Sequence, residues 1–185
     1  MKLSTRNMTL VALFAAITAV CSQIAIPLPF SPVPFTLQVV AVCLAGGILG
    51  SKLGGLALIV YILMGAAGMP VFAQFKGGLQ VLVGPTGGFL FSFPIAAFLI
   101  GFVMERKNSL VTSIASMMFA LILIYGLGFV QFKFVTAMGW EKSFYLVVAP
   151  YVVPDIIKII LTSAVVLSVN RSLERNNLKP KLQKI

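Results

Sequence analysis

The chain has 185 residues, of which 59% are hydrophobic and only 10% are charged, whereas soluble domains carry about 25% charged residues. This composition excludes an ordinary soluble domain and predicts a single-domain membrane protein with several spans. The sequence contains no histidine, which excludes histidine-based catalysis and histidine metal sites.

Six apolar segments predict an all-α bundle of six membrane-spanning helices. They cover residues 7–26, 35–49, 54–69, 89–104, 110–130 and 144–169. The connection Pro27–Pro34 holds four prolines in eight residues. Because proline lacks an N–H donor and fixes φ, we predict an ordered non-helical loop there. Two more loops stand out: Val71–Gly88, which is aromatic and glycine-rich, and the mixed loop Gln131–Ser143.

The lysine and arginine residues indicate how these segments are oriented. If the N-terminus lies in the cytoplasm, ten of these residues fall on the inner side, three on the outer side and Lys158 in the membrane. The inner residues are Lys2, Arg6, Lys52, Arg106, Lys107, Arg171, Arg175, Lys179, Lys181 and Lys184, and the outer ones are Lys76, Lys133 and Lys142. This bias follows the positive-inside rule. We therefore predict a multi-pass protein of the cytoplasmic membrane with both termini in the cytoplasm and no role in nucleic-acid binding.

A charged pair, Asp155 and Lys158, lies inside the sixth apolar segment. Each charge at the centre of a bilayer costs roughly 2.5–3.5 kcal/mol on insertion scales, and residues at i and i+3 share one helix face. Helix rise places Asp155 about 15 Å below the outer end of its segment, beneath the three outer loops. We therefore predict an outward-facing pocket, roofed by these loops, in which both residues bind a polar ligand. The alternative is an ion pair that only fixes helix packing.

Uncharged polar and aromatic residues near the outer ends of the segments are further candidate ligand contacts. They are Phe35, Thr36, Gln38, Phe72, Gln74 and Tyr151. Together they suit a site that holds an apolar ring with a few hydrogen-bonding edges. Thr86 and Gly87 belong to Gly84–Gly88, a tight bend that offers exposed backbone amides and one hydroxyl. This bend either clasps a polar ligand group or is only a re-entrant turn.

The first apolar segment carries alanines at helical spacing. Ala12 and Ala16 form one pair, and Ala15 and Ala19 form another. Small residues four positions apart let helices approach closely in lipid. These alanines are either a docking face for another membrane protein or packing residues within the chain.

Signatures of ATP binding and of catalysis are missing from the sequence. No G-x-x-x-x-G-K-[ST] motif occurs, so the chain has no P-loop for ATP. With no histidine, no cysteine pair at ligand spacing and one buried carboxylate, we expect no catalytic residues, no metal site and no cofactor. An intramembrane enzyme is therefore disfavoured.

Four motifs, in order along nearly the whole chain, resemble the BioY family of biotin-binding S components of energy-coupling factor (ECF) transporters. They are Pro34–Gln38, Gly68–Ala73, Gly84–Leu90 and Pro154-Asp155-x-x-Lys158. The resemblance implies a six-helix bundle that captures biotin from outside with high affinity. It also implies uptake powered by one transmembrane coupling protein, which the first-span alanines meet, and two ATP-binding subunits. The alternative is an S component or stand-alone transporter for another small vitamin or solute.

Biotin could meet the charged pair in two orientations. Asp155 can accept from a ureido N–H while Lys158 donates to the ureido C=O, or Lys158 neutralises the carboxylate while Asp155 holds Lys158 in place. We favour the first, because a deep polar floor suits the ring end and leaves the tail facing the loops. Lys76 can approach the carboxylate, in a stretch where the family is often glycine-rich. The sequence leaves open whether the chain transports alone.

Overall fold

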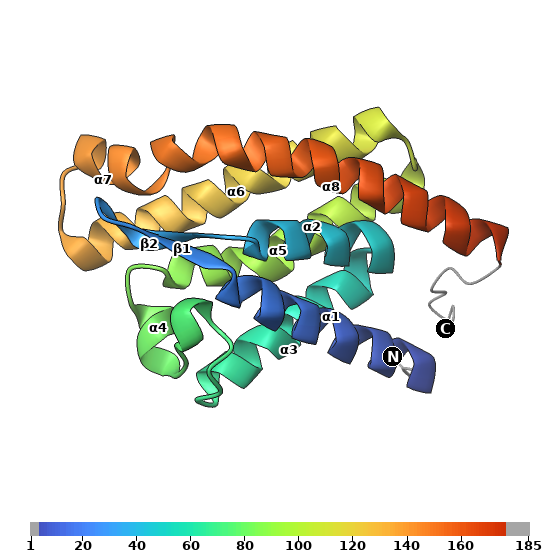
Figure 1. Ribbon diagram of the computed structural model, residues 1–185, viewed down its shortest axis with the longest axis horizontal. Helices are drawn as coiled ribbons and strands as arrows, with labels where there is room; N and C mark the ends of the chain where they lie inside the picture. Colours follow the sequence, from blue (N-terminus) through green and yellow to red (C-terminus); the bar gives the residue numbers. More distant parts are fainter. Residues whose placement is uncertain (1–3, 177–185) are drawn as a thin grey trace.

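The computed structural model describes residues 4–176, and most of them lie in helices (Figure 1). The helices are α1 (Thr5–Gln23), α2 (Gln38–Leu49), α3 (Ser51–Ala66), α4 (Leu79–Val83), α5 (Gly87–Arg106), α6 (Leu110–Thr136), α7 (Trp140–Val147) and α8 (Ala149–Arg175). Two strands, β1 (Ala25–Leu28) and β2 (Ser31–Thr36), and a 3-10 turn, η1 (Ala73–Phe75), complete the described part of the chain. Four basic residues used for the predicted orientation lie outside the described residues: Lys2, Lys179, Lys181 and Lys184.

Four stretches of the described chain are long and apolar enough to cross a membrane. They are α1, α5, α6 and the α7–α8 stretch Trp140–Arg175. The apolar helices α2 and α3 are shorter, with 12 and 16 residues. The prediction of a mostly helical membrane protein is therefore confirmed.

Capping side chains, a glycine and a proline explain where several helices begin. The Ser4 and Ser109 side chains accept hydrogen bonds from backbone N–H groups in the first turns of α1 and α6, which satisfies donors that a helix leaves unpaired. Gly50, at φ 82°, turns the chain between α2 and α3, a conformation that favours glycine. Pro150 stands in the first turn of α8, where its missing N–H costs nothing.

In Figure 1 the long helices run roughly along one axis, with α2 enclosed near the centre. The start of α1 and the end of α8 lie at one end of the molecule, and the hairpin β1–β2, α4 and α7 lie at the other. We call these the terminal end and the hairpin end. This arrangement places the irregular segments together at one end of the bundle.

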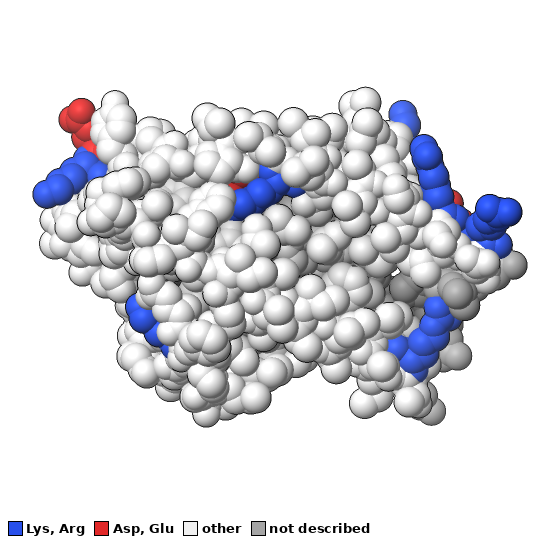
Figure 2. All heavy atoms as spheres, in the orientation of Figure 1, with Lys and Arg blue, Asp and Glu red and all other residues white. Residues whose placement is uncertain are grey.

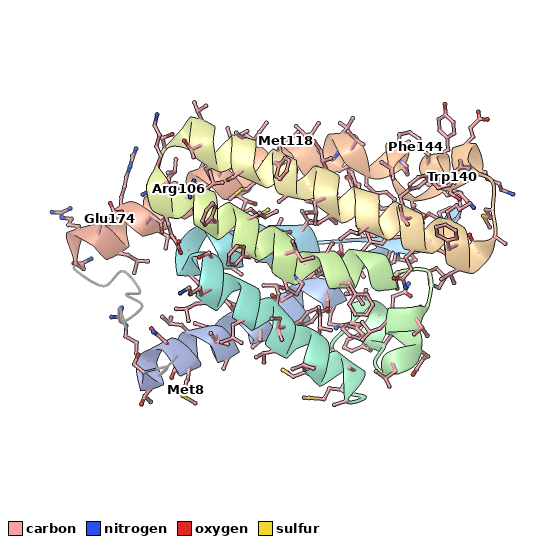
Figure 3. The ribbon with its side chains drawn as sticks, turned by 180° about the vertical axis from the view of Figure 1, so that it is seen from behind. Met8, Arg106, Met118, Trp140, Phe144 and Glu174 are labelled. Carbon is pink, nitrogen blue, oxygen red and sulfur yellow. The ribbon has the colours of Figure 1, made fainter. Side chains whose placement is uncertain are left out.

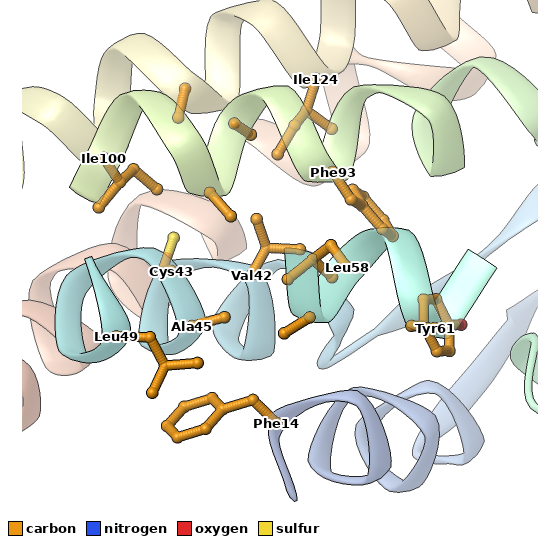
Figure 4. Close-up of a cluster of buried hydrophobic side chains, with 14 of the residues drawn as sticks. Phe14, Val42, Cys43, Ala45, Leu49, Leu58, Tyr61, Phe93, Ile100 and Ile124 are labelled. Carbon is orange, nitrogen blue, oxygen red and sulfur yellow. The ribbon is translucent and has the colours of Figure 1, made fainter. Parts of the chain in front are cut away.

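Large apolar side chains and small residues share the core. Val42, Leu58 and Ile100, from α2, α3 and α5, are all fully buried and meet in the cluster of Figure 4. Glycines let the backbones approach closely: a Cβ added at Gly46 would lie 2.4 Å from the Ala97 carbonyl oxygen. Close backbone approach through small residues is typical of helix packing in membranes.

The proline-rich connection is more regular than predicted. The ordered loop expected at residues 27–34 lies within an antiparallel hairpin, in which Ala25 pairs with Thr36 and Leu28 with Ser31. The first two helices consequently end at Gln23 and begin at Gln38. Prolines are tolerated in a strand whose neighbouring edge is open, so a two-stranded hairpin accommodates them.

The predicted sixth segment, residues 144–169, is not one helix in the structure. It breaks at Val148, whose dihedral angles are φ −121° and ψ −62°, and α7 ends there while α8 begins at Ala149. Because proline cannot continue the hydrogen bonding of a preceding helix, Pro150 accounts for the break. Helices α6 and α8 also extend beyond the predicted ends, to Thr136 and Arg175.

Candidate ligand-binding site

A cavity of about 800 Å³, including space open to solvent, lies at the hairpin end. Its walls come from strand β2 of the hairpin, α2, the turn around η1, α4, α5, α6, α7 and α8. Eight of the ten predicted binding residues line it: Thr36, Gln38, Phe72, Gln74, Thr86, Tyr151, Asp155 and Lys158. The structure thus brings together residues that are up to 122 positions apart in the sequence. Their role in binding stays a prediction.

Asp155 and Lys158 form an ion pair on the wall of this cavity. The Lys158 Nζ atom lies 2.8 Å from Asp155 Oδ1, as expected for i, i+3 neighbours on a helix. Asp155 is 3% exposed, and its other oxygen accepts a hydrogen bond of 2.7 Å from the Tyr125 hydroxyl. Lys158 also donates to the Thr36 carbonyl oxygen at 2.7 Å, and its Nζ lies 3.6 Å from the centre of the Phe35 ring. Both charges therefore have partners within the protein.

The two remaining predicted contacts, Phe35 and Gly87, do not line the cavity. Phe35 lies against the Lys158 ammonium group, where the ring face attracts a cation. Gly87 is buried behind the cavity wall, because a Cβ there would lie 1.7 Å from the Leu82 carbonyl oxygen. Gln131 on α6 holds this bend from behind by donating to the carbonyls of Leu82 at 2.7 Å and Gly84 at 2.9 Å. Phe35 and Gly87 therefore support the cavity wall from outside the cavity.

Hydrogen bonds also fix the polar groups near the ion pair. The Gln38 Nε2 atom donates to the Tyr61 hydroxyl at 2.8 Å, and Tyr61 donates to the Val71 carbonyl at 3.1 Å. The Thr36 hydroxyl donates to Gln38 Oε1 at 3.2 Å. Since every one of these groups is held, the wall is preorganised for a ligand of defined shape.

Tyr151 on α8 fastens the hairpin to the bundle. Its hydroxyl donates to the Val33 carbonyl oxygen and lies 3.0 Å from Ser31 Oγ. Lys158, two helical turns further along α8, holds the Thr36 carbonyl in the same way. The hairpin thus covers the cavity while tied to α8 at two places.

Tyr125 and Lys76 complete the polar lining. Tyr125 was not predicted, although a phenol in the middle of an apolar helix is itself a signal, because a buried tyrosine hydroxyl usually finds a partner. Lys76, the cation expected to approach a ligand carboxylate, is exposed and lines the cavity. Phe89 and Phe93 on α5 add aromatic walls that the sequence interpretation did not identify. The cavity therefore has a charged pair on one side, apolar walls and a second cation.

The four alanines of α1 differ in burial. Ala15 is 1% exposed and belongs to the core, and Ala19 packs against it. Ala12 and Ala16, on neighbouring positions of the same side of the helix, are exposed. Ala12 and Ala16 are therefore the most accessible of the four alanines, and a docking role for them stays a prediction.

Charged side chains are distributed between the two ends of the molecule. Figure 2 shows lysine and arginine atoms gathered at both ends of the long axis. Between them this face is largely uncharged, apart from one basic group with a small acidic area beside it near the middle. Such an uncharged belt is typical of a surface in contact with lipid. No group of three potential metal-ligating side chains occurs among residues 4–176.

The fold and the cavity define a helical membrane protein with a cavity near one end, of the kind in which small molecules bind. The sequence profile of the BioY family matches residues 1–175 of the chain. The biotin transporter BioY of Thermotoga maritima is 43% identical over 166 residues, which cover 90% of this chain and 96% of that protein. A probable biotin transporter BioY of Pyrococcus horikoshii is 44% identical over 154 residues, or 83% and 89% of the two chains.

Two solved structures have a similar fold. The S-component for biotin from an ECF-type ABC transporter superposes with a TM-score of 0.82 at 26% identity, covering 92% of this chain and 95% of that one. The S component of a bacterial ECF transporter superposes with a TM-score of 0.54 at 19% identity, covering 93% and 97%, and shows the fold alone. The chain belongs to the BioY family.

Proposed function

We propose that this chain captures biotin at the outer side of the cytoplasmic membrane, as the substrate-binding S component of an ECF-type ABC transporter. The observation that carries the proposal is the cavity with its Asp155–Lys158 pair, in a chain whose relatives are named biotin transporters. Biotin has an apolar thioether ring, a ureido edge with one acceptor and two donors, and a carboxylate tail. The apolar walls and the two polar regions of the cavity match these three parts.

The charges favour one orientation of biotin. Asp155 already neutralises Lys158, so a ligand carboxylate beside this pair would be an additional buried charge without its own counter-ion, which is costly. A neutral ureido edge avoids this cost. Its N–H groups can donate to remaining lone pairs of Asp155 or to the Tyr125 oxygen, since each oxygen accepts more than one hydrogen bond. The tail then extends to Lys76, whose exposed ammonium group lines the same cavity.

We further propose a six-span topology with both termini in the cytoplasm, in which the shorter helices α2 and α3 are the second and third spans. Six lysines and arginines of the described chain belong to the terminal end and three to the hairpin end, in agreement with the positive-inside rule. The terminal set is Arg6, Lys52, Arg106, Lys107, Arg171 and Arg175, and the hairpin set is Lys76, Lys133 and Lys142. Trp140 and Phe144 are exposed at the hairpin end (Figure 3), as in the aromatic belts of membrane interfaces.

The partners that this function requires are a transmembrane coupling protein and two ATP-binding subunits. The described chain offers the exposed pair Ala12 and Ala16 on α1 as the contact for the coupling protein. Whether transport depends on these partners can be tested by measuring biotin uptake into proteoliposomes that contain the chain with and without the coupling protein and ATP-binding subunits. Uptake by the chain alone would show that the module is dispensable.

Direct binding tests the substrate. Purified protein should retain biotin, and desthiobiotin should compete, because it keeps the ureido edge and the carboxylate. Thiamine and riboflavin should not compete. Competition by either vitamin, with none by desthiobiotin, would instead identify an S component for a different substrate.

A further inference from the structure

The turn between Phe72 and Lys76 is backbone-strained. Gln74 and Phe75 have φ angles of 61° and 56°, in the left-handed region that side-chain-bearing residues rarely adopt. One backbone hydrogen bond of 2.9 Å, from Phe72 N–H to the Lys76 carbonyl, closes the turn. Strain of this kind persists only where the surrounding structure holds it.

The side chain of Gln23, the last residue of α1, stabilises this turn by hydrogen bonds. Its Nε2 atom donates to the Phe72 carbonyl at 3.1 Å, and its Oε1 atom accepts from the Phe75 N–H at 2.9 Å. The same Nε2 lies 2.7 Å from the Ser22 hydroxyl, which donates to the Val71 carbonyl at 2.6 Å. One amide group therefore bridges both halves of the turn, with its donor on one half and its acceptor on the other.

The same turn forms a wall of the ligand cavity. Phe72, Ala73, Gln74 and Lys76 line the cavity, whereas Phe75 points outward and is 71% exposed. Opening of the turn would move four lining residues at once. Phe75 can be altered without changing the lining of the cavity.

We infer that Gln23 is a positioning residue for ligand retention, which holds the turn 72–76 against the cavity and thereby sets how slowly the ligand leaves. The inference rests on the proposed capture of biotin. Because the cavity is open to solvent with the turn in place, we expect the ligand to enter without opening of the turn. Loss of the Gln23 bridge should therefore act on dissociation and leave association nearly unchanged.

The test is Gln23→Met, which preserves the length of the side chain and removes its donor and acceptor. Loss of these bonds to a strained turn should raise the rate of biotin dissociation roughly tenfold, with the association rate changed less than about twofold. The matched control is Gln80→Met on α4, where the amide donates to the nearby Gly77 carbonyl at 2.7 Å. Biotin should dissociate from Gln80→Met at the same rate as from the unaltered chain.

A second substitution separates strain from general damage. Glycine adopts a φ near 56° without steric cost, so Phe75→Gly should slow dissociation when combined with Gln23→Met. Failure of this rescue, or an unchanged dissociation rate in Gln23→Met, overturns the inference.

Hydrogen exchange of the ligand-free protein tests the hold on the turn independently of biotin. The Phe75 amide should exchange faster in Gln23→Met than in the unaltered chain, because Gln23 is its acceptor. Equal exchange overturns the inference whatever the protein binds. If the Phe75 amide exchanges faster in Gln23→Met but the unaltered chain retains no biotin, the role of Gln23 in holding the turn is supported and the proposed function is refuted.

Discussion

The ion pair of Asp155 and Lys158 should behave as one energetic unit, which a double-mutant cycle can measure. Lys158→Met leaves the Asp155 carboxylate, with a side chain 5% exposed, in the protein interior with Tyr125 as its remaining partner. Asp155→Asn leaves Lys158, 12% exposed, with the Thr36 carbonyl and the Phe35 ring. The lysine substitution should therefore be the more destabilising of the two.

The magnitudes follow from the burial of the pair. Removing one partner of a buried ion pair costs about 3–5 kcal/mol of folding free energy, and we expect Lys158→Met near the upper limit and Asp155→Asn near the lower. Since the double substitution leaves no uncompensated charge, it should be about 2 kcal/mol more stable than Lys158→Met alone. All three variants should bind biotin at least about tenfold more weakly, because a hydrogen bond to a charged group contributes about 1.5–3 kcal/mol.

Chemical unfolding in detergent micelles measures the four stabilities, and retention of labelled biotin measures binding. Lys142→Met, at an exposed position of the hairpin end, is the control for losing a lysine and should change neither quantity. A double variant whose destabilisation equals the sum of the two single effects would refute the energetic coupling of the pair. Unweakened biotin binding by all three variants would refute its place in the site.

Three further outcomes are expected. Tyr125→Phe should weaken biotin binding by roughly tenfold and lower stability by about 1–3 kcal/mol, because Asp155 loses a buried donor; calorimetric titration and unfolding measure the two effects. Lys76→Gln should weaken the binding of biotin severalfold at low salt, where the charge of an exposed cation is little screened. The same substitution should leave the binding of biotin methyl ester unaffected, because the ester has no negative charge. Equal effects on both ligands would exclude a contact between Lys76 and the carboxylate. Ala16→Leu should preserve biotin binding by the purified chain and abolish uptake with the coupling module, since a large side chain prevents close helix approach.

Much of the cavity lining could be predicted because its strongest signals are local. Asp155 and Lys158 are conspicuous in an apolar segment, and their i, i+3 spacing alone places them on one helix face. Tyr125 was missed because its significance depends on a contact with another helix, 30 residues away in the sequence. Gly87 lies outside the cavity lining, which the sequence could not show because a glycine-rich bend has the same pattern whether its amides face a ligand or the neighbouring helix.

The fold shows the same division between local and long-range information. Apolar length predicted the helical class, and the prolines correctly predicted a non-helical connection between the first two helices. Prolines exclude a helix but do not specify that two strands pair. In the structure the paired strands are also held by hydrogen bonds from Tyr151 and Lys158 on α8, and these long-range contacts leave no local pattern in the sequence. The break at Val148 separates two helices within one apolar run, so hydropathy could not reveal it.

The two anchors of the hairpin have a consequence for protein engineering. Both Tyr151 and Lys158 hold carbonyl oxygens of the main chain, at Val33 and Thr36, and every amino acid supplies such an oxygen. The side chains of Pro32 and Val33 can therefore be varied without removing these two hydrogen bonds to the bundle. A library that varies Pro32 and Val33, which line the cavity, offers a route to sensors for vitamins with rings of other shapes.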